Sequence, residues 1–183
     1  MKGIMKISVF GGSQPKEGDT AYQEAYTLGK LLAEAGHTVM TGGYIGTMEA
    51  VSRGASELGG HVVGVTCAEI ENWRPVRPNG WVKEEWRRDT LLERLQVLVE
   101  ECDAGIALPG GPGTLTEIAL MWNLMIVESI PRRPLVLVGS GWQSVFDQFY
   151  TQLDVYIAEK QRKLVQFAED VETAVNELES WKV

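Results

Sequence analysis

Short apolar segments rich in β-branched residues recur along the 183-residue chain, each separated from the next by enough chain for a helix. They are "KISVF" (6–10), "HTVM" (37–40), "HVVGVT" (61–66), "AGIAL" (104–108) and "PLVLV" (134–138). Continuous apolar runs of this length are typical of strands that are buried on both faces of a sheet. Strands that alternate with crossover helices form parallel sheets, so the pattern predicts an α/β fold.

The intervening segments carry helical patterns, and glycines mark where the helices end. The segments are 20–36, 46–60, 90–102 and 114–129, with two more helices expected at 140–153 and 168–181. Gly36 and the pair Gly59-Gly60 stand where a left-handed C-terminal cap is wanted, and Asp170 or Glu169 could cap the last helix. We therefore expect a Rossmann-like doubly wound parallel sheet flanked by helices, in a single domain over residues 1–183.

One stretch, residues 67–89, fits neither pattern. "CAEIENWRPVRPNGWVKEEWRRD" combines prolines, a glycine and tryptophans without clear periodicity, so we expect a long irregular loop. A loop of this length in a compact domain is usually functional or a contact surface. Because it follows the third strand, it should overhang the same sheet edge as the strand-to-helix turns.

Three of those turns are rich in glycine: "GGS" (11–13), "TGGYIG" (41–46) and "PGGPGT" (109–114). Open α/β sheets bind ligands at the carboxyl ends of their strands, especially where the strand order reverses. The usual order 3-2-1-4-5 places that reversal between the first and fourth predicted strands, so 11–13 and 109–114 should face each other.

Each turn leads into a helix whose free N–H groups suit a phosphate, and glycine lets a phosphate approach the backbone closely. Glycine is also common in strand-to-helix turns of any kind. Three such turns on one edge nevertheless favour a ligand.

Other nucleotide and cofactor motifs are absent. The chain contains neither G-x-G-x-x-G nor G-x-x-x-x-G-K-[ST], which disfavours a P-loop enzyme. No lysine lies in the three glycine turns, so a pyridoxal phosphate site is hard to place, and we expect no cofactor. Cys67 and Cys102 are too few and too far apart for a zinc site or a disulfide framework; Cys102 reads as a core residue, Cys67 is left open, and we expect no metal site.

The net charge and the hydropathy limit which partners and which cellular location we expect. A net charge of -8 argues against binding a nucleic acid polymer, although one small phosphorylated ligand needs only a local site. No apolar run approaches the roughly 20 residues of a membrane span, and the N-terminus lacks the layout of a signal peptide. We expect a cytoplasmic protein with a small-molecule partner and no membrane contact.

Glu117 admits two interpretations. Thr114-x-x-Glu117 has the spacing of a capping box, in which both side chains satisfy free N–H groups at a helix start. The same carboxylate, one turn into a helix that faces the predicted crevice, could reach a ligand. The two roles are compatible.

The sequence pattern alone does not decide the role of Arg94 either. It falls at the margin of an apolar helical stripe formed by Leu91, Leu92, Leu95, Leu98 and Val99. An arginine in this position usually extends to water. The alternative is a guanidinium held near the crevice, where it would pair a phosphate or stabilise charge.

The histidines, three methionines and one tryptophan are interpreted as residues with structural roles. His37 and His61 begin strands, away from the glycine turns, so neither is expected to be a catalyst or a metal ligand. Met48, Met121, Met125 and Trp122 are interpreted mainly as core residues. An exposed Trp and Met on the helix after Glu117 would suit a dimer interface.

Several segments together resemble the LOG (lonely guy) family of nucleoside 5′-monophosphate phosphoribohydrolases, proteins often labelled possible lysine decarboxylases. "PGGPGTLTE" fits the family signature P-G-G-x-G-T-x-x-E, and the resemblance covers roughly residues 4 to 140. The other matching segments are "VFGGS", "GGYIGTMEAVSRGA", "GGHVVGV" and "ERLQVLVEECDAGIALPGG". A match in several parts is specific for the superfamily.

The resemblance implies a Rossmann-like fold, a homodimer or higher homo-oligomer, and cleavage of a nucleotide into free base and ribose 5-phosphate. It implies that Glu117 and Arg94 are the catalytic residues and that AMP or a cytokinin riboside monophosphate is the type of substrate. Gly110, Gly111, Gly113 and Thr114 would bind the phosphate, and Gly12, Ser13, Gly43, Gly46 and Met48 complete the expected substrate-binding set.

The chain departs from the family pattern in ways that bear on substrate. Leu95 replaces the lysine of E-R-K, and Thr41 and Glu49 stand where cytokinin-activating members commonly have glycine. Some relatives in the wider superfamily resemble nucleotide or molybdenum-cofactor carriers without hydrolysis. A non-catalytic binding or carrier protein is therefore the alternative function.

Overall fold

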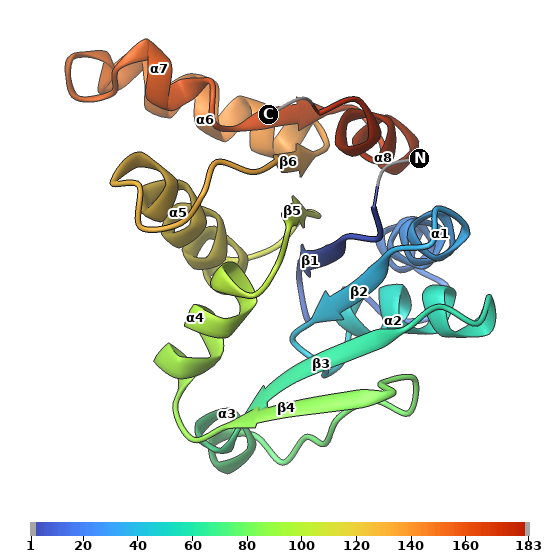
Figure 1. Ribbon diagram of the computed structural model, residues 1–183. Coiled ribbons are helices and arrows are strands. Elements are labelled where there is room, and N and C mark those ends of the chain that lie inside the picture. The colour runs from blue at the N-terminus through green and yellow to red at the C-terminus, as the bar shows by residue number, and fades with distance from the viewer. Residues whose placement is uncertain (1–2, 182–183) are drawn as a thin grey trace.

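The computed structural model describes residues 3–181, in which seven strands form one parallel sheet (Figure 1). The spatial order is β4-β3-β2-β1-β5-β6-β7. The strands are β1 (Lys6–Phe10), β2 (Thr38–Thr41), β3 (Val62–Cys67), β4 (Glu84–Arg88), β5 (Ala104–Ala107), β6 (Leu135–Val138) and β7 (Gln166–Ala168). The predicted α/β, Rossmann-like fold is confirmed.

Helices cover both faces of the sheet. One face is covered by α1 (Thr20–Glu34), α2 (Thr47–Glu57) and α8 (Val171–Ser180). The other face is covered by α4 (Leu91–Glu100), α5 (Pro112–Ile126) and α6 (Ser140–Gln152). Short helices α3 (Ala68–Trp73), η1 (Asp154–Tyr156) and α7 (Glu159–Arg162) lie in the connections. Figure 1 shows α4 and α5 on the left of the sheet and α1 and α2 on the right.

The strand order reverses beside β1, as predicted. β1 pairs with β2 on one side and with β5 on the other, with Phe10 opposite Ala107 in the second pair. The chain therefore leaves β1 and β2 towards one face and β5 towards the other. Such a reversal is where doubly wound sheets form their ligand site, here at the carboxyl ends of β1 and β5.

Two glycines let α1 and α2 pack with their backbones in close approach. A Cβ on Gly29 would collide with the carbonyl of Val51, and one on Gly54 would collide with the carbonyl of Tyr26. Close backbone packing of this kind allows no larger side chain without moving a helix. The start of α2 is thereby held at the carboxyl edge of the sheet.

The prediction of an irregular loop over 67–89 is wrong in part, because this segment contains α3 and the edge strand β4. β4 reads "EEWRR", and no residue in it is fully buried, so an edge strand here carries none of the apolar signal of the central strands. The three-residue strand β7 at the opposite edge was also missed. Edge strands are commonly short or charged, which removes the pattern that sequence reasoning uses.

Most predicted caps are confirmed. Gly36 and Gly59 have φ values of 80° and 78°, in the left-handed region expected of a helix C-cap. Asp170 accepts a 2.8 Å hydrogen bond from the N–H of Thr173 and caps α8. Both cysteines are buried and free, and no helix within 3–181 has the length and hydropathy to cross a membrane.

Candidate active site

The three glycine turns meet above β1. The N–H of Gly12 donates to the carbonyl of Pro109 at 3.3 Å, which joins the first turn to the third. The N–H of Thr47 and its hydroxyl donate to the carbonyl of Gly12 at 2.9 and 3.0 Å, which joins the first turn to the second. The turns that were predicted to share one sheet edge therefore touch one another.

The second turn requires glycine at two positions. Gly43 and Gly46 have φ values of 78° and 76°, which residues with a Cβ rarely adopt. A Cβ on Gly46 would also collide with the carbonyl of Gly12 and lie 2.6 Å from the Cα of Ser13. The absence of side chains here is what brings the turns together.

The third turn leads into α5, which begins earlier than predicted. Its N-cap is Gly111 and its first residue is Pro112, with no side-chain cap hydrogen bond. Proline is favoured at the first helical position because it lacks the N–H that would be unpaired there. The predicted capping box of Thr114 and Glu117 is therefore wrong, and Thr114 does not start the helix.

Gly110, Gly111 and Gly113 are exposed, whereas Thr114 is buried. The open turn precedes a 15-residue helix with free N–H groups at its start. The predicted phosphate-binding residues thus lie together in an arrangement that could hold an anion.

Arg94 faces inward from the first turn of α4 and is 5% exposed. Its Nε donates to the carbonyl of Val65 at 2.8 Å and its Nη2 to the carbonyl of Gly42 at 3.3 Å. The guanidinium carbon lies 5.7 Å from the centre of the Tyr44 ring. The usual interpretation of a marginal helical arginine as a surface residue is therefore wrong, because carbonyls at the ends of two strands hold this one inside.

Glu117 lies opposite, on α5, with its Oε1 3.9 Å from Nη1 of Arg94. It is 8% exposed and accepts no hydrogen bond from the described residues. Burial raises the pKa of this carboxyl to about 7, and the charge of Arg94 limits the rise. A carboxyl that titrates near neutrality and is not engaged in a cap is available for acid–base chemistry.

Residues of the 67–89 segment support the second glycine turn. Asn79 donates from Nδ2 to the carbonyls of Gly43 at 3.0 Å and Tyr44 at 2.8 Å. The buried Tyr44 hydroxyl in turn donates to the carbonyl of Cys67 at 3.1 Å and accepts from the N–H of that residue. Sequence reasoning missed Tyr44 and Asn79 as supports of Arg94, because only the fold brings them together.

Met48 is only partly buried and borders the arginine, since a Cβ on Gly42 would lie 2.6 Å from its Sδ. Met121, Met125 and Trp122 are buried, which confirms their interpretation as core residues. The suggestion of an exposed Trp and Met on this helix is therefore wrong.

Both histidines lie away from the glycine turns and face carboxylates. His37 Nε2 is 2.7 Å from Glu179, and His61 Nε2 is 2.9 Å from Glu84. Within the described part of the chain, no group of three or more His, Cys, Asp or Glu side chains could hold a metal ion.

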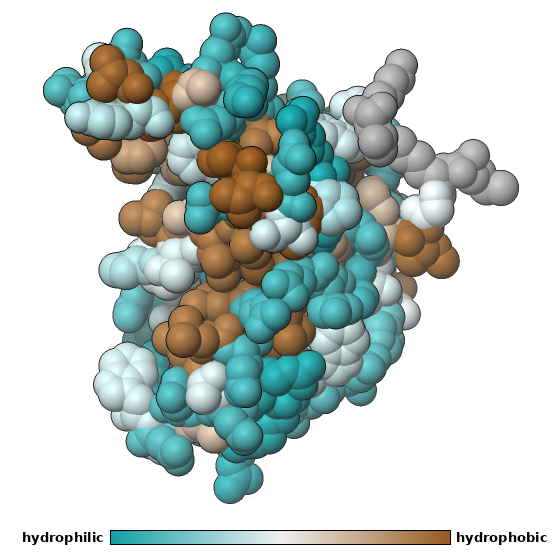
Figure 2. Space-filling model, turned by 60° about the vertical axis from the view of Figure 1, so that its left-hand side comes forward, coloured by the Kyte–Doolittle hydropathy of each residue, from teal (hydrophilic) through white to brown (hydrophobic). Residues whose placement is uncertain are grey.

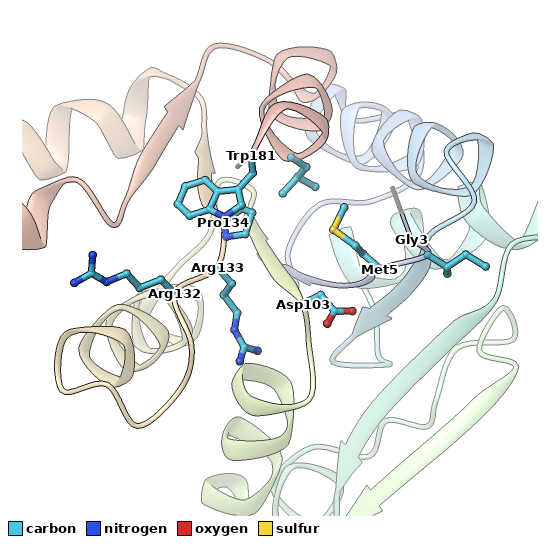
Figure 3. Close-up of a pocket in the computed structure, with 9 residues that line it drawn as sticks. Gly3, Met5, Asp103, Arg132, Arg133, Pro134 and Trp181 are labelled. Atoms are coloured by element: carbon cyan, nitrogen blue, oxygen red, sulfur yellow. The ribbon is translucent and has the colours of Figure 1, made fainter. Parts of the chain in front are cut away.

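Two cavities lie at different edges of the sheet. The cavity in Figure 3, of about 330 Å³, is lined by residues such as Asp103, Pro134 and Trp181, near the amino-terminal ends of the strands. It contains none of the predicted site residues. A second cavity of about 280 Å³ includes Ser13 and Gly46 in its wall and adjoins the glycine turns.

Substituting Gly42 by alanine should displace Arg94. The added Cβ would collide with Nη2 of the arginine, and a catalytic group misplaced by about 1 Å can cost about a hundredfold in rate. We expect the rate of the nucleotide cleavage that the family resemblance implies to fall about tenfold to a hundredfold. The matched control is Gly80→Ala, where a Cβ meets nothing within 4 Å; a wild-type rate in Gly42→Ala would contradict this role for Arg94.

Comparison with known families agrees with this geometry. The family model of the SLOG cluster4 family matches residues 4–175, nearly the whole chain. The chain belongs to this family. The resemblance to LOG proteins seen in the sequence is thereby confirmed.

Two curated rice proteins (Oryza sativa subsp. japonica) show the relation to LOG enzymes. "Probable cytokinin riboside 5′-monophosphate phosphoribohydrolase LOGL5" is 38% identical over 69% of this chain and 52% of its own length. "Cytokinin riboside 5′-monophosphate phosphoribohydrolase LOG" is 32% identical over 96% of this chain and 73% of its own length. The chain therefore spans about half of the first relative and about three quarters of the second.

A solved structure with a similar fold is named for a different ligand. The molybdenum cofactor binding protein of the phototrophic bacterium Rippkaea orientalis superposes with a TM-score of 0.76 and 25% identity, covering 98% of both chains. The chain thus has sequence relatives with enzymatic names and a structural neighbour with the name of a binding protein.

Proposed function

We propose that this chain hydrolyses the N-glycosidic bond of a nucleoside 5′-monophosphate, of the AMP or cytokinin riboside monophosphate type. The observation that carries the proposal is the buried pair of Glu117 and Arg94, 3.9 Å apart, beside the open glycine turn at 110–113. LOG relatives with this named activity support it.

The chemistry requires a carboxylate near the ribose. The bond between the base nitrogen and C1′ breaks with its electrons going to the base, while water attacks C1′ through an oxocarbenium-like transition state. Ionised Glu117 would stabilise the positive ribose and take a proton from the attacking water. Glu117 then passes that proton to the departing base, so the products are the neutral free base and ribose 5-phosphate, and the carboxylate is regenerated.

The other groups bind and orient the substrate. N–H groups at the start of α5, with Thr114, would hold the 5′-phosphate, whose binding energy then positions the ribose. Arg94 would stabilise charge on the departing base or on the phosphate, and its three contacts keep it in place without the substrate. Gly12, Ser13, Gly43, Gly46 and Met48 would form the remaining wall.

A carrier role is the second candidate, favoured by the likeness to the molybdenum cofactor binding protein and by Leu95 in place of the lysine of E-R-K. Incubation of the purified protein with AMP, GMP, CMP and UMP, followed by chromatography, separates the two. The hydrolase releases free base from at least one of them. Tight nucleotide binding by calorimetry without any base release would replace the hydrolase with the carrier.

We also propose that the chain forms a homodimer through an apolar band over α4 and α5. Figure 2 shows apolar side chains gathered in a band on this side of the molecule. The exposed large apolar residues of α4 and α5 include Leu92 (78%) and Leu115 (44%), and Val127 (59%) directly follows α5. Apolar surface gathered in this way marks an interaction site, and the commonest solution is a two-fold pair.

Light scattering of the purified protein should give twice the mass of the 20.2 kDa chain. Leu92→Asp combined with Val127→Asp should give the monomer mass, because burying two carboxylates per subunit in an apolar interface is unfavourable. The control Val155→Asp, at another exposed apolar residue on η1, should keep the dimer. A monomeric wild type would contradict the proposal.

A further inference from the structure

The cavity of about 280 Å³ beside the glycine turns lies on the α1 and α2 side of the site. Its wall includes Ser13 and Gly46, which also belong to the proposed substrate site. Its size is near the lower end of the roughly 300–1,000 Å³ typical of small-molecule pockets, so it suits a part of a ligand.

Arg74, directly after α3, lines this cavity and carries an unpaired donor. Its Nε is buried and has no hydrogen-bond acceptor within residues 3–181. The guanidinium carbon lies 5.6 Å from the ring centre of the adjacent Trp73, and no carboxylate of the described chain pairs with it. Buried N–H donors are normally paired, so a ligand with acceptor oxygens fits here.

The charges around Arg74 leave an excess of cations. Lys16 has no ion pair among the described residues, whereas Glu17 is paired with Arg53 at 2.7 Å. Glu49 is the one lining carboxylate without a described ion pair. Two free cations therefore face one free carboxylate, although the whole chain has a net charge of -8. The local excess favours an anionic group.

The cavity continues the proposed phosphate site. A Cβ on Gly12 would lie 3.6 Å from the Cα of Gly110, so the first turn directly borders the third. Ser13 then forms the wall of the cavity on the other side of this turn. A group attached to a phosphate at the 110–114 turn would reach the cavity across Gly12 and Ser13.

We propose that this cavity binds the second phosphate of a nucleoside 5′-diphosphate whose first phosphate lies at the 110–114 turn. Arg74 and Lys16 bind the second phosphate, and Glu49 limits how tightly it is held. The inference rests on the phosphate position of the proposed function, and it extends the ligand class beyond monophosphates.

Calorimetry with ADP and AMP tests this subsite, in the Glu117→Gln background so that neither nucleotide is turned over. ADP should bind at least about tenfold more tightly than AMP at low ionic strength, because charge-assisted hydrogen bonds to the second phosphate are added. Arg74→Gln should reduce the ratio of the two affinities to near one. The control Arg77→Gln, an exposed arginine outside the cavity, should leave the ratio unchanged.

Glu49→Gln provides a second variant, for which we expect the opposite effect on the affinity for ADP. Removing the carboxylate should increase the affinity for ADP several-fold. A decrease would overturn the proposal, because the cavity would then recognise a hydrogen-bond donor rather than a phosphate. Equal affinities for ADP and AMP in the parent protein would also overturn it.

The two proposals fail separately. Base release from AMP without an ADP preference overturns the subsite alone. An ADP preference without base release from any monophosphate by the wild-type protein supports the subsite and overturns the hydrolase.

Discussion

Glu117→Gln should abolish base release and at the same time stabilise the folded protein. The rate should fall about a hundredfold or more, because glutamine can neither take a proton from water nor balance the positive ribose. Crystal or circular dichroism comparison should show an unchanged fold, since glutamine has nearly the same shape. Base release from AMP and urea unfolding at several pH values measure both effects.

The gain in stability follows from the raised pKa of Glu117. Its folded pKa is about 7 against an ordinary value of 4.5, so the unfolded chain loses this proton first as pH rises. Stability is therefore full below about pH 4.5, falls up to about pH 7 and stays reduced above it, by about 3 kcal/mol at roughly 1.4 kcal/mol per pH unit. Glutamine does not ionise, so the variant should be more stable than wild type at pH 8 and equal to it at pH 4.5.

A capping role predicts a different result. In that case, Glu117→Gln would leave stability nearly unchanged at every pH, since glutamine can also serve a capping box. Equal unfolding free energies at pH 8, with full activity, would contradict the assignment of Glu117 as a buried catalytic carboxylate.

Arg94→Gln should reduce activity about a hundredfold and shift its pH dependence upward. In the wild type the charge of Arg94 lowers the pKa of Glu117, so its loss should raise that pKa above about 7. Any residual base release should then require a higher pH than the wild type needs. The pH profile of the residual rate is the measurement, with the exposed Arg132→Gln as control.

The same variant should lose about 3 kcal/mol of unfolding free energy at pH 8, because a buried carboxylate loses its partner and the Val65 and Gly42 carbonyls lose their donor. The loss should be smaller at pH 5.5, where Glu117 is protonated in both proteins. An unchanged pH midpoint and a loss independent of pH would contradict the coupling of these two residues.

The central strands could be predicted because burial on both faces leaves a continuous apolar run. β1 was predicted with its observed bounds, and the reversal between β1 and β5 follows from general rules for doubly wound sheets. The edge strand β4 could not be predicted in this way, because four of its five residues are charged and none is fully buried.

Two Thr-x-x-Glu segments with the same spacing show what a local sequence pattern cannot predict. "TLLE" at 90–93 and "TLTE" at 114–117 both match the capping-box pattern, but only Thr90 and Glu93 form one. Thr90 stands immediately before its helix, whereas Pro112 starts the other helix two residues before Thr114. The glycines and proline before Thr114 were the signal that could have placed this start correctly.

The direction of Arg94 could not be read from periodicity at all. Its hydrogen-bond acceptors lie 29 and 52 residues away in the chain, at the ends of β2 and β3. Glu117 owes its raised pKa to burial by the same tertiary structure. The family resemblance predicted roles for both residues, and the fold explains physically why they lie together.

The most direct test of the central claim is the pH dependence of base release from AMP between pH 5.5 and 8.5. Wild type should release free base and ribose 5-phosphate in equal amounts, with a rate that rises through a midpoint near pH 7 as Glu117 ionises. Glu117→Gln should show no such rise. A wild-type protein that releases no base at any pH, or a rate independent of pH in this range, would contradict the account.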